Sequence, residues 1–262
     1  MTAFMLAIDV GNSHTVAGLF ADGNLEEHWR VATDAHATAD QLAAALASLL
    51  ALTDRSLDQA RELIVSSVVP PLVSQYERLA RRHLDTEALV VGPGIRTGLP
   101  ILTNNPHEVG ADRIVNAVAA LDILGGPCVV VDFGTATTFC ALSAAGEYLG
   151  GAIAPGVEVS LDALTARAAQ LSRVDLFKPE AVVGKTTSTS LRAGVVYGFA
   201  GLVDGIVGRM RQELGGDGVP TIATGGFAGL IVPETFTLSR VDPLLTLKGL
   251  KLVHERNEKG GL

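Results

Sequence analysis

Cysteine and histidine are scarce in this chain, which narrows the chemistry it can carry. The two cysteines, Cys128 and Cys140, lie in apolar segments, and two thiols cannot build a disulfide framework or a cysteine zinc site. The six histidines form no HxxxH or HExxH pair, so the sequence predicts no transition-metal site. We expect two buried, reduced thiols of a cytosolic protein.

Positive charge and long apolar runs are scarce as well. The chain has twenty Lys and Arg residues and twenty-eight Asp and Glu residues, which gives a net charge of −8. The longest basic run is Arg81-Arg82. Because a nucleic-acid partner normally requires a basic face, we expect none. No run approaches the roughly 20 apolar residues of a membrane span, and the N-terminus lacks the features of a signal peptide. We therefore expect a cytoplasmic protein without a membrane partner.

Aromatic residues make up only 5% of the chain, whereas hydrophobic residues make up 48%. Ala, Val, Leu and Gly dominate, as is typical of α/β folds in which helices pack on sheets. A length of 262 residues fits one large domain or two closely packed ones.

Hydrophobic patterns predict two sets of three strands, each followed by helices and further strands. The predicted strands are 5–10, 15–20, 25–32, 63–69, 88–91, 128–132, 137–142, 148–153 and 220–224. The predicted helices are 38–52, 72–83, 106–124, 157–169, 187–214, a short one after 226 and a closing one from 242, with a frayed tail at 255–262.

One pattern occurs twice, about half the chain apart. Residues 9–15 and 132–138 both read Asp-x-Gly-polar-small-x-Thr, and each copy lies between two predicted strands. This repeat predicts a duplicated β-β-β-α domain, with halves at 1–118 and 119–262 whose hairpins face each other across a cleft. Taken alone, either copy could merely cap a hairpin, because Asp-x-Gly is a common turn.

The two hairpins have the composition of phosphate-binding turns. Their glycines let the backbone approach a phosphate, and backbone N–H groups in such turns bind anions. Small polar side chains add donors, and Asp9 and Asp132 are available to a cation such as Mg²⁺. The donors are Asn12, Ser13, Thr15, Thr135, Thr137 and Thr138.

Other nucleotide signals are weaker. The turn Gly225-Gly226 after a strand could lie against adenine or ribose, although such turns often serve packing only. Gly184-Lys185-Thr186 resembles the end of a P-loop, but Pro179 stands where that motif needs Gly. No GxGxxG follows the first strand, so a dinucleotide fold is not supported.

The segment Gly110-Ala111-Asp112-Arg113 places adjacent opposite charges in a predicted apolar helix. Arg suits a carboxylate through its bidentate fork, and Asp can deprotonate an attacking hydroxyl in phosphoryl transfer. The alternative is a solvated ion pair, which is the commoner fate of adjacent Asp and Arg.

Together these motifs resemble the superfamily of acetate kinases, sugar kinases, heat-shock chaperones and actin, and within it the type III pantothenate kinases. The resemblance covers essentially the whole chain. The matching segments are DVGNSHT at 9–15, TGLPI at 97–101, NPHEVGADRIVNA at 105–117, VDFGTATT at 131–138, GGAIAPG at 150–156, GKTTSTSLRAG at 184–194, ATGG at 223–226 and DPLLTLKGL at 242–250.

The resemblance implies duplicated ribonuclease H-like (actin-like ATPase) domains with a nucleotide cleft, phosphorylation of pantothenate to 4′-phosphopantothenate in coenzyme A biosynthesis, and a homodimer with helix 187–214 at its interface. Asp112 would be the general base, and Asp132 would hold K⁺ or NH₄⁺, with Mg²⁺ accompanying ATP. The residues implied for ATP are Asp9, Val10, Gly11, Asn12, Ser13, His14, Thr15, Val16 and Thr135, to which we add Gly225 and Gly226. Those implied for pantothenate are Gly110, Ala111, Asp112, Arg113 and Thr187.

Two positions depart from the family pattern. Thr103 replaces a common substrate-side Tyr, and His14 replaces the usual Asn of the first hairpin. The alternatives are a kinase of the same superfamily for another small substrate, such as acetate or a sugar, and a non-catalytic, nucleotide-binding regulatory protein. The presence of Asp9, Asp112 and Asp132 favours catalysis.

Overall fold

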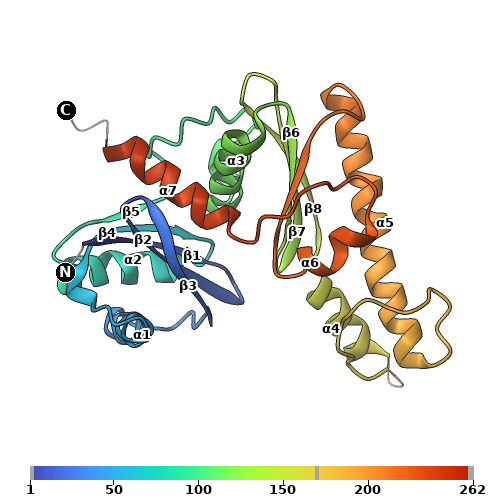
Figure 1. Cartoon of the computed structure of the whole chain (residues 1–262), viewed down its shortest axis with the longest axis horizontal. Helices are drawn as coiled ribbons and strands as arrows, with labels where there is room; N and C mark the ends of the chain where they lie inside the picture. The colour runs from blue at the N-terminus through green and yellow to red at the C-terminus, as the bar shows by residue number, and fades with distance from the viewer. Residues whose placement is uncertain (1–2, 169–170, 259–262) are drawn as a thin grey trace. The chain divides into compact units, whose positions relative to one another are not determined.

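The computed structural model describes residues 3–168 and 171–258 (Figure 1). The chain forms two compact units, and neither is one continuous stretch. Unit 1 contains the residues up to Gly98, Asn105–Ala119 and the segment from Thr246, whereas unit 2 contains Leu99–Asn104 and Ala120–Leu245. The predicted halves 1–118 and 119–262 remain a prediction.

Unit 1 is built on a five-stranded sheet in the order β3-β2-β1-β4-β5. The first three strands form an antiparallel meander, and β4 and β5 continue the sheet in parallel with β1. The strands are β1 (Phe4–Val10), β2 (His14–Ala21), β3 (Asn24–Ala32), β4 (Ala60–Ser67) and β5 (Ala88–Val90).

Helices cover the sheet of unit 1. Helix α1 (Ala39–Ala51) begins at the N-cap Thr38, whose side chain forms a capping box with Gln41. It packs with α2 (Pro70–Leu79) in one core cluster with β1 and β4. A π-helical turn (Ala80–Leu84) continues α2.

Most of two further helices belongs to unit 1: α3 (Ala111–Leu124) up to Ala119 and α7 (Leu245–Glu258) from Thr246 onward. They meet closely, because Gly249 lies against the backbone of Val115. On the same helix, Leu247 lies against Gly18 of β2.

Unit 2 repeats this plan with a four-stranded sheet in the order β8-β7-β6-β9. Strands β6, β7 and β8 form an antiparallel meander, and β9 pairs with β6 in parallel. The elements are β6 (Cys128–Phe133), β7 (Ala136–Leu142), β8 (Tyr148–Pro155), α4 (Val157–Arg167), α5 (Thr187–Leu214), β9 (Thr221–Gly225), α6 (Ala228–Ile231) and a 3₁₀ turn (Val232–Glu234). Their apolar side chains form the core of this unit.

The order of strands confirms the predicted duplication. In each unit an antiparallel three-strand meander is followed by a parallel strand beside its first strand. Residues 9–15 and 132–138 occupy the same place in both, the turn between the first and second strands. The repeat in the sequence is therefore a repeat in the fold.

Several boundaries differ from the prediction. The helix expected over 106–124 begins at Ala111, because only a 3₁₀ turn (Pro106–Glu108) forms after Pro106 and Val109 is extended. The closing helix α7 continues through 255–258, where fraying was expected. Residues 259–262 of that tail and residue 169, the expected end of α4, lie outside the described residues.

Helix α5 is the one described helix that is long and apolar enough to cross a membrane, by length and composition. Charged residues such as Arg192 and Asp204 interrupt this helix, so it is not an unbroken apolar run of the kind that the sequence lacks. Seven α5 residues are buried in unit 2, among them Val196, Val203 and Val207, which are fully buried. Because the core helix of a globular unit passes the same test, the helix carries no argument for a membrane.

Candidate functional site

The first hairpin of unit 1 joins β1 to β2 through Gly11, Asn12 and Ser13. The backbone N–H of Gly11 donates to the carbonyl of His14 at 3.0 Å, which closes the turn. A Cβ at position 11 would lie 2.9 Å from that same carbonyl oxygen, so the turn requires glycine. Asn12 and Ser13 are exposed at the tip, where their polar groups can meet a ligand.

Thr33 holds this hairpin from the side. Its hydroxyl donates to the carbonyl of Gly11 at 2.8 Å, and its own oxygen lies 2.9 Å from the hydroxyl oxygen of Thr15. Because the Thr33 proton points to Gly11, Thr15 is the donor in the second bond. The backbone N–H of Thr33 also donates to the carbonyl of Ser13 at 3.0 Å. Sequence reasoning missed Thr33, since it lies just beyond β3 with no local motif.

His14 is oriented by a residue on the neighbouring strand. Nη2 of Arg30 lies 3.0 Å from Nδ1 of His14. A guanidinium can only donate, so Nδ1 accepts and the ring proton lies on Nε2 in this arrangement. His14 thus presents a fixed N–H donor at the base of the hairpin, as the amide of an Asn would.

The second predicted segment of unit 1 lies at the start of α3. Gly110 precedes the helix, and Ala111, Asp112 and Arg113 form its first turn. The backbone N–H of Arg113 donates to Oδ1 of Asp112 at 2.8 Å. A Cβ at Gly110 would collide with this carboxylate oxygen. The glycine therefore makes room for the carboxylate.

Burial raises the pKa of the Asp112 carboxyl above its ordinary value. The N–H and the positive charge of Arg113 oppose this shift without cancelling it. A carboxylate whose pKa is raised is a stronger base, and it accepts a proton from a hydroxyl more readily once ionised. Asp112 therefore has the electrostatic setting of a general base.

Val68 brings the two segments of unit 1 together. Its backbone N–H donates to the carbonyl of Val10 at 3.0 Å, and its side chain lies 3.8 Å from where a Cβ of Gly110 would be. Both segments thus meet beside the carboxyl ends of the parallel strands β1 and β4, where open α/β sheets bind ligands.

Ser66 adds a polar group at the same level of the sheet. It pairs with Asp9 across the parallel strands. Its fully buried hydroxyl has no hydrogen-bond partner among the described residues. Sequence reasoning missed Ser66, because a Ser inside an apolar strand gives no signal.

The second hairpin, in unit 2, joins β6 to β7 through Gly134 and Thr135. The N–H of Gly134 donates to the carbonyl of Ala136 at 3.1 Å, and the N–H of Gly156 donates to the carbonyl of Thr135 at 3.1 Å. A Cβ at Gly156 would collide with both hairpin carbonyls. The motif GGAIAPG thus ends in a glycine that supports the hairpin, a role that sequence reasoning did not assign.

The structure brings Asp132 and the glycine turn together in unit 2. Asp132 pairs with Thr224 between β6 and β9. Gly225 has a φ of +93°, and a Cβ there would lie 2.5 Å from Oδ1 of Asp132. Gly226 follows and is exposed. The half-buried carboxylate of Asp132 is an oxygen ligand suited to a hard cation.

Thr187 and Thr103 lie elsewhere in unit 2. Thr187 is the exposed first residue of α5, next to the N-cap Thr186, whose side chain forms a capping box with Thr189. The hydroxyl of Thr103 is buried without a hydrogen-bond partner among the described residues. No described contact joins either residue to Asp132.

Comparisons with known proteins identify relatives over nearly the whole chain. The family described as type III pantothenate kinase matches residues 5–209. A type III pantothenate kinase of Moorella thermoacetica is 51% identical over 253 residues, covering 97% of this chain and 99% of the relative. One of Streptomyces avermitilis is 52% identical over 260 residues, covering 97% and 98%.

Solved structures of lower identity share the fold. A protein described as a Baf family transcriptional activator from Campylobacter jejuni has a TM-score of 0.63 at 20% identity, covering 97% of this chain and all of that one. The ethanolamine utilization protein EutJ of Carboxydothermus hydrogenoformans has a TM-score of 0.59 at 14% identity, covering 97% and 90%. These likenesses, with the repeated sheets, confirm the predicted duplicated, actin-like fold.

Proposed function

Because the chain belongs to the type III pantothenate kinase family, we propose that it transfers the γ-phosphate of ATP to the primary hydroxyl of pantothenate. The product is 4′-phosphopantothenate, the first intermediate on the way to coenzyme A. The observation that carries this proposal is the half-buried Asp112 at the start of α3. Burial raises the pKa of its carboxyl, and Val68 contacts both this segment and the hairpin at Gly11.

Asp112 acts as the general base in this proposal. It takes the proton of the pantothenate hydroxyl while the oxygen attacks the γ-phosphorus, and ADP leaves. Its carboxylate is held by the N–H of Arg113, and the guanidinium of Arg113 pairs with the pantothenate carboxylate. Gly110 and Ala111 leave room for the substrate, and Thr187 adds a contact.

The nucleotide is bound by the two hairpins. Asp9 to Val16 contact the phosphates, with Nε2–H of His14 donating, and Thr135 adds a contact from unit 2. Gly225 and Gly226 lie against the adenosine. Mg²⁺ accompanies ATP and neutralises charge on the phosphates. Asp132 holds a monovalent cation, K⁺ or NH₄⁺, for which its carboxylate oxygen is a suitable partner.

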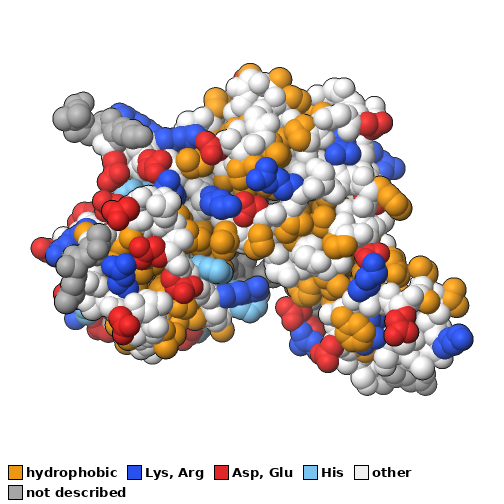
Figure 2. Space-filling model, viewed as in Figure 1, with side chains coloured by type: hydrophobic (Ala, Val, Ile, Leu, Met, Phe, Trp, Pro, Cys, Tyr) orange, Lys and Arg blue, Asp and Glu red, His pale blue; other side chains and the backbone are white. Residues whose placement is uncertain are grey.

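The protein works as a cytoplasmic homodimer in this proposal. Support for an interface comes from unit 2, where Val182 and Val183, just before α5, are 67% and 81% exposed. Figure 2 shows hydrophobic side chains at the surface of this part of the unit. A second protomer covering them would remove apolar surface from water.

The test is ADP release by purified protein with Mg²⁺ and K⁺, with and without pantothenate. We expect release that depends on pantothenate and a product whose mass is that of a phosphopantothenate. Release at the same rate without pantothenate, or with acetate or a sugar in its place, would point to another acceptor. Nucleotide binding without turnover would support a regulatory protein instead.

A further inference from the structure

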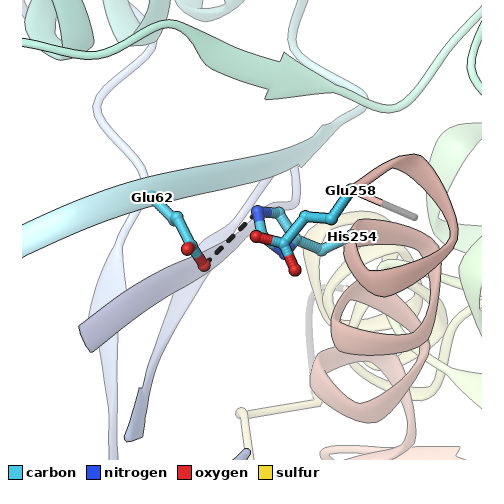
Figure 3. Close-up of side chains that lie close together, drawn as sticks. All are labelled: Glu62, His254 and Glu258. Atoms are coloured by element: carbon cyan, nitrogen blue, oxygen red, sulfur yellow. Dashed lines mark ion pairs between the residues drawn. The ribbon is translucent and has the colours of Figure 1, made fainter. Parts of the chain in front are cut away.

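A histidine lies between two carboxylates in unit 1, away from the residues discussed above. His254 and Glu258 stand four residues apart on α7, so they share one face of the helix. Glu62 reaches toward them from β4 (Figure 3). Nε2 of His254 lies 3.6 Å from Oε2 of Glu62, and Nδ1 lies 3.8 Å from Oε2 of Glu258.

These distances are too long for hydrogen bonds. The 3.6 Å between Nε2 of His254 and Oε2 of Glu62 matches the separation of two ligands on one metal ion, because ligands about 2.1 Å from a tetrahedral ion lie about 3.4 Å apart. Glu258 lies beside the other ring nitrogen, Nδ1. One ligand atom from each of the three residues lies within 4.8 Å of the others. An i, i+4 pair on a helix is also a common spacing for metal ligands.

Burial and charge favour a cation here. The side chain of His254 is only 10% exposed, and the group borders a cavity of about 300 Å³. Among the described residues, Asp22, Glu62, Glu255 and Glu258 line this cavity together with two permanent cations, Arg61 and Lys251. Lys251 is already paired with Glu255 at 2.8 Å. In the part of the chain that the structure describes, carboxylates therefore outnumber permanent cations around this cavity.

We propose that Glu62, His254 and Glu258 bind one divalent transition-metal ion, such as Zn²⁺. Imidazole nitrogen with carboxylate oxygen suits a first-row metal of this kind. Nε2 of His254 and Glu62 supply two ligands in their present positions. Glu258, whose side chain is 53% exposed, supplies the third by a change of rotamer, and water completes the shell.

The site is distinct from the nucleotide hairpin of the same unit. Glu62 pairs with Met5 on β1, whereas Asp9 pairs with Ser66. Four residues along a strand correspond to about 13 Å, so the metal lies toward the amino ends of β1 and β4 and the hairpin at their carboxyl ends. The ion therefore ties α7 to the sheet without taking part in phosphoryl transfer.

The test is a titration of untagged protein with Co²⁺ in the absence of nucleotide, followed by competition with Zn²⁺. We expect one Co²⁺ per chain, with the visible absorption of a nitrogen- and oxygen-ligated ion that Zn²⁺ displaces. Replacing Glu62→Gln or His254→Ala should weaken Co²⁺ binding about tenfold or more. Mutating even the residues that only orient metal ligands typically lowers metal affinity by about 10–100-fold.

Glu255→Gln is the matched control, because Glu255 is next to His254 and lines the same cavity but lies outside the ligand set. It should bind Co²⁺ as the unaltered protein does. If His254→Ala fails to fold, Glu258→Gln at the half-exposed helix end gives the same comparison. Equal affinity in all variants, or no saturable absorption, would overturn the proposal and leave the three residues as an ion-pair cluster.

Discussion

The carboxylate of Asp112 fills the space that a side chain at position 110 would need. The N–H of Arg113 donates to the same oxygen at 2.8 Å. Gly110 and Asp112 thus form one unit at the start of α3, in which the missing Cβ decides where the carboxylate lies. The direction of the proposed base depends on this glycine.

Replacing Gly110→Ala should lower kcat while the protein stays folded, because the new methyl group pushes the carboxylate aside. A misplacement of about 1 Å can cost about 10²-fold in rate, so we expect a loss of about ten- to hundredfold in steady-state kinetics. Gly92→Ala is the control, since nothing lies within 4 Å of the added atom there. An unchanged kcat for Gly110→Ala would show that Asp112 is positioned by other contacts.

Replacing Thr33→Val should weaken ATP binding. The change removes the hydroxyl that donates to Gly11 and accepts from Thr15, and an unpaired polar group costs about 1–3 kcal/mol. We expect a higher KM for ATP and an unchanged KM for pantothenate. Thr33→Ser keeps the hydroxyl and should restore most of the affinity, whereas equal defects in both variants would argue against the hydrogen bonds.

Replacing Asp112→Asn should not destabilise the protein at neutral pH. Because burial raises the pKa of Asp112 in the folded state, the folded protein holds this proton more tightly than the unfolded chain. The carboxyl therefore favours folding less as pH rises from its unfolded pKa through its folded pKa. The Asn variant should unfold at an equal or higher temperature at pH 7, and its advantage should shrink in acid. A variant clearly less stable at pH 7 would contradict the raised pKa.

Kinase activity should require K⁺ or NH₄⁺. We expect turnover to fall away in Na⁺ or Li⁺ buffer and to return when K⁺ is added, because Asp132 is proposed to hold the larger cation. Asp132→Asn should lose most of this response. Equal rates in every salt would remove Asp132 from that role.

Local sequence signals predicted the strands and the hairpins well. Each Asp-x-Gly turn lies between apolar strands, so both the residues and their flanks marked the turn. The ends of strands and helices were less predictable where polar residues interrupt the hydrophobic pattern. Strand β4 begins at Ala60, three residues before the predicted start, although the polar Arg61 and Glu62 follow. Helix α2 begins at Pro70, two residues before the predicted start at 72.

The candidate site was predictable only in its motif residues. Thr33 contacts Gly11, and Ser66 pairs with Asp9 across the sheet, both far along the chain. Nothing beside these residues in the sequence marks those pairings. The same holds for His254, since a search for paired histidines cannot find a set whose third member is Glu62 on a far strand. That the two hairpins face each other across a cleft remains a prediction from the repeat.

The most direct test of the proposed kinase mechanism is a single-turnover measurement on the Asp112→Asn variant. The affinity of the same variant for Mg²⁺–ATP is measured beside it. If Asp112 is the general base, phosphate transfer to pantothenate should slow by about 10²–10⁴-fold while the affinity for the nucleotide stays as in the unaltered protein. Transfer at a near-normal rate would contradict the account and place the base elsewhere.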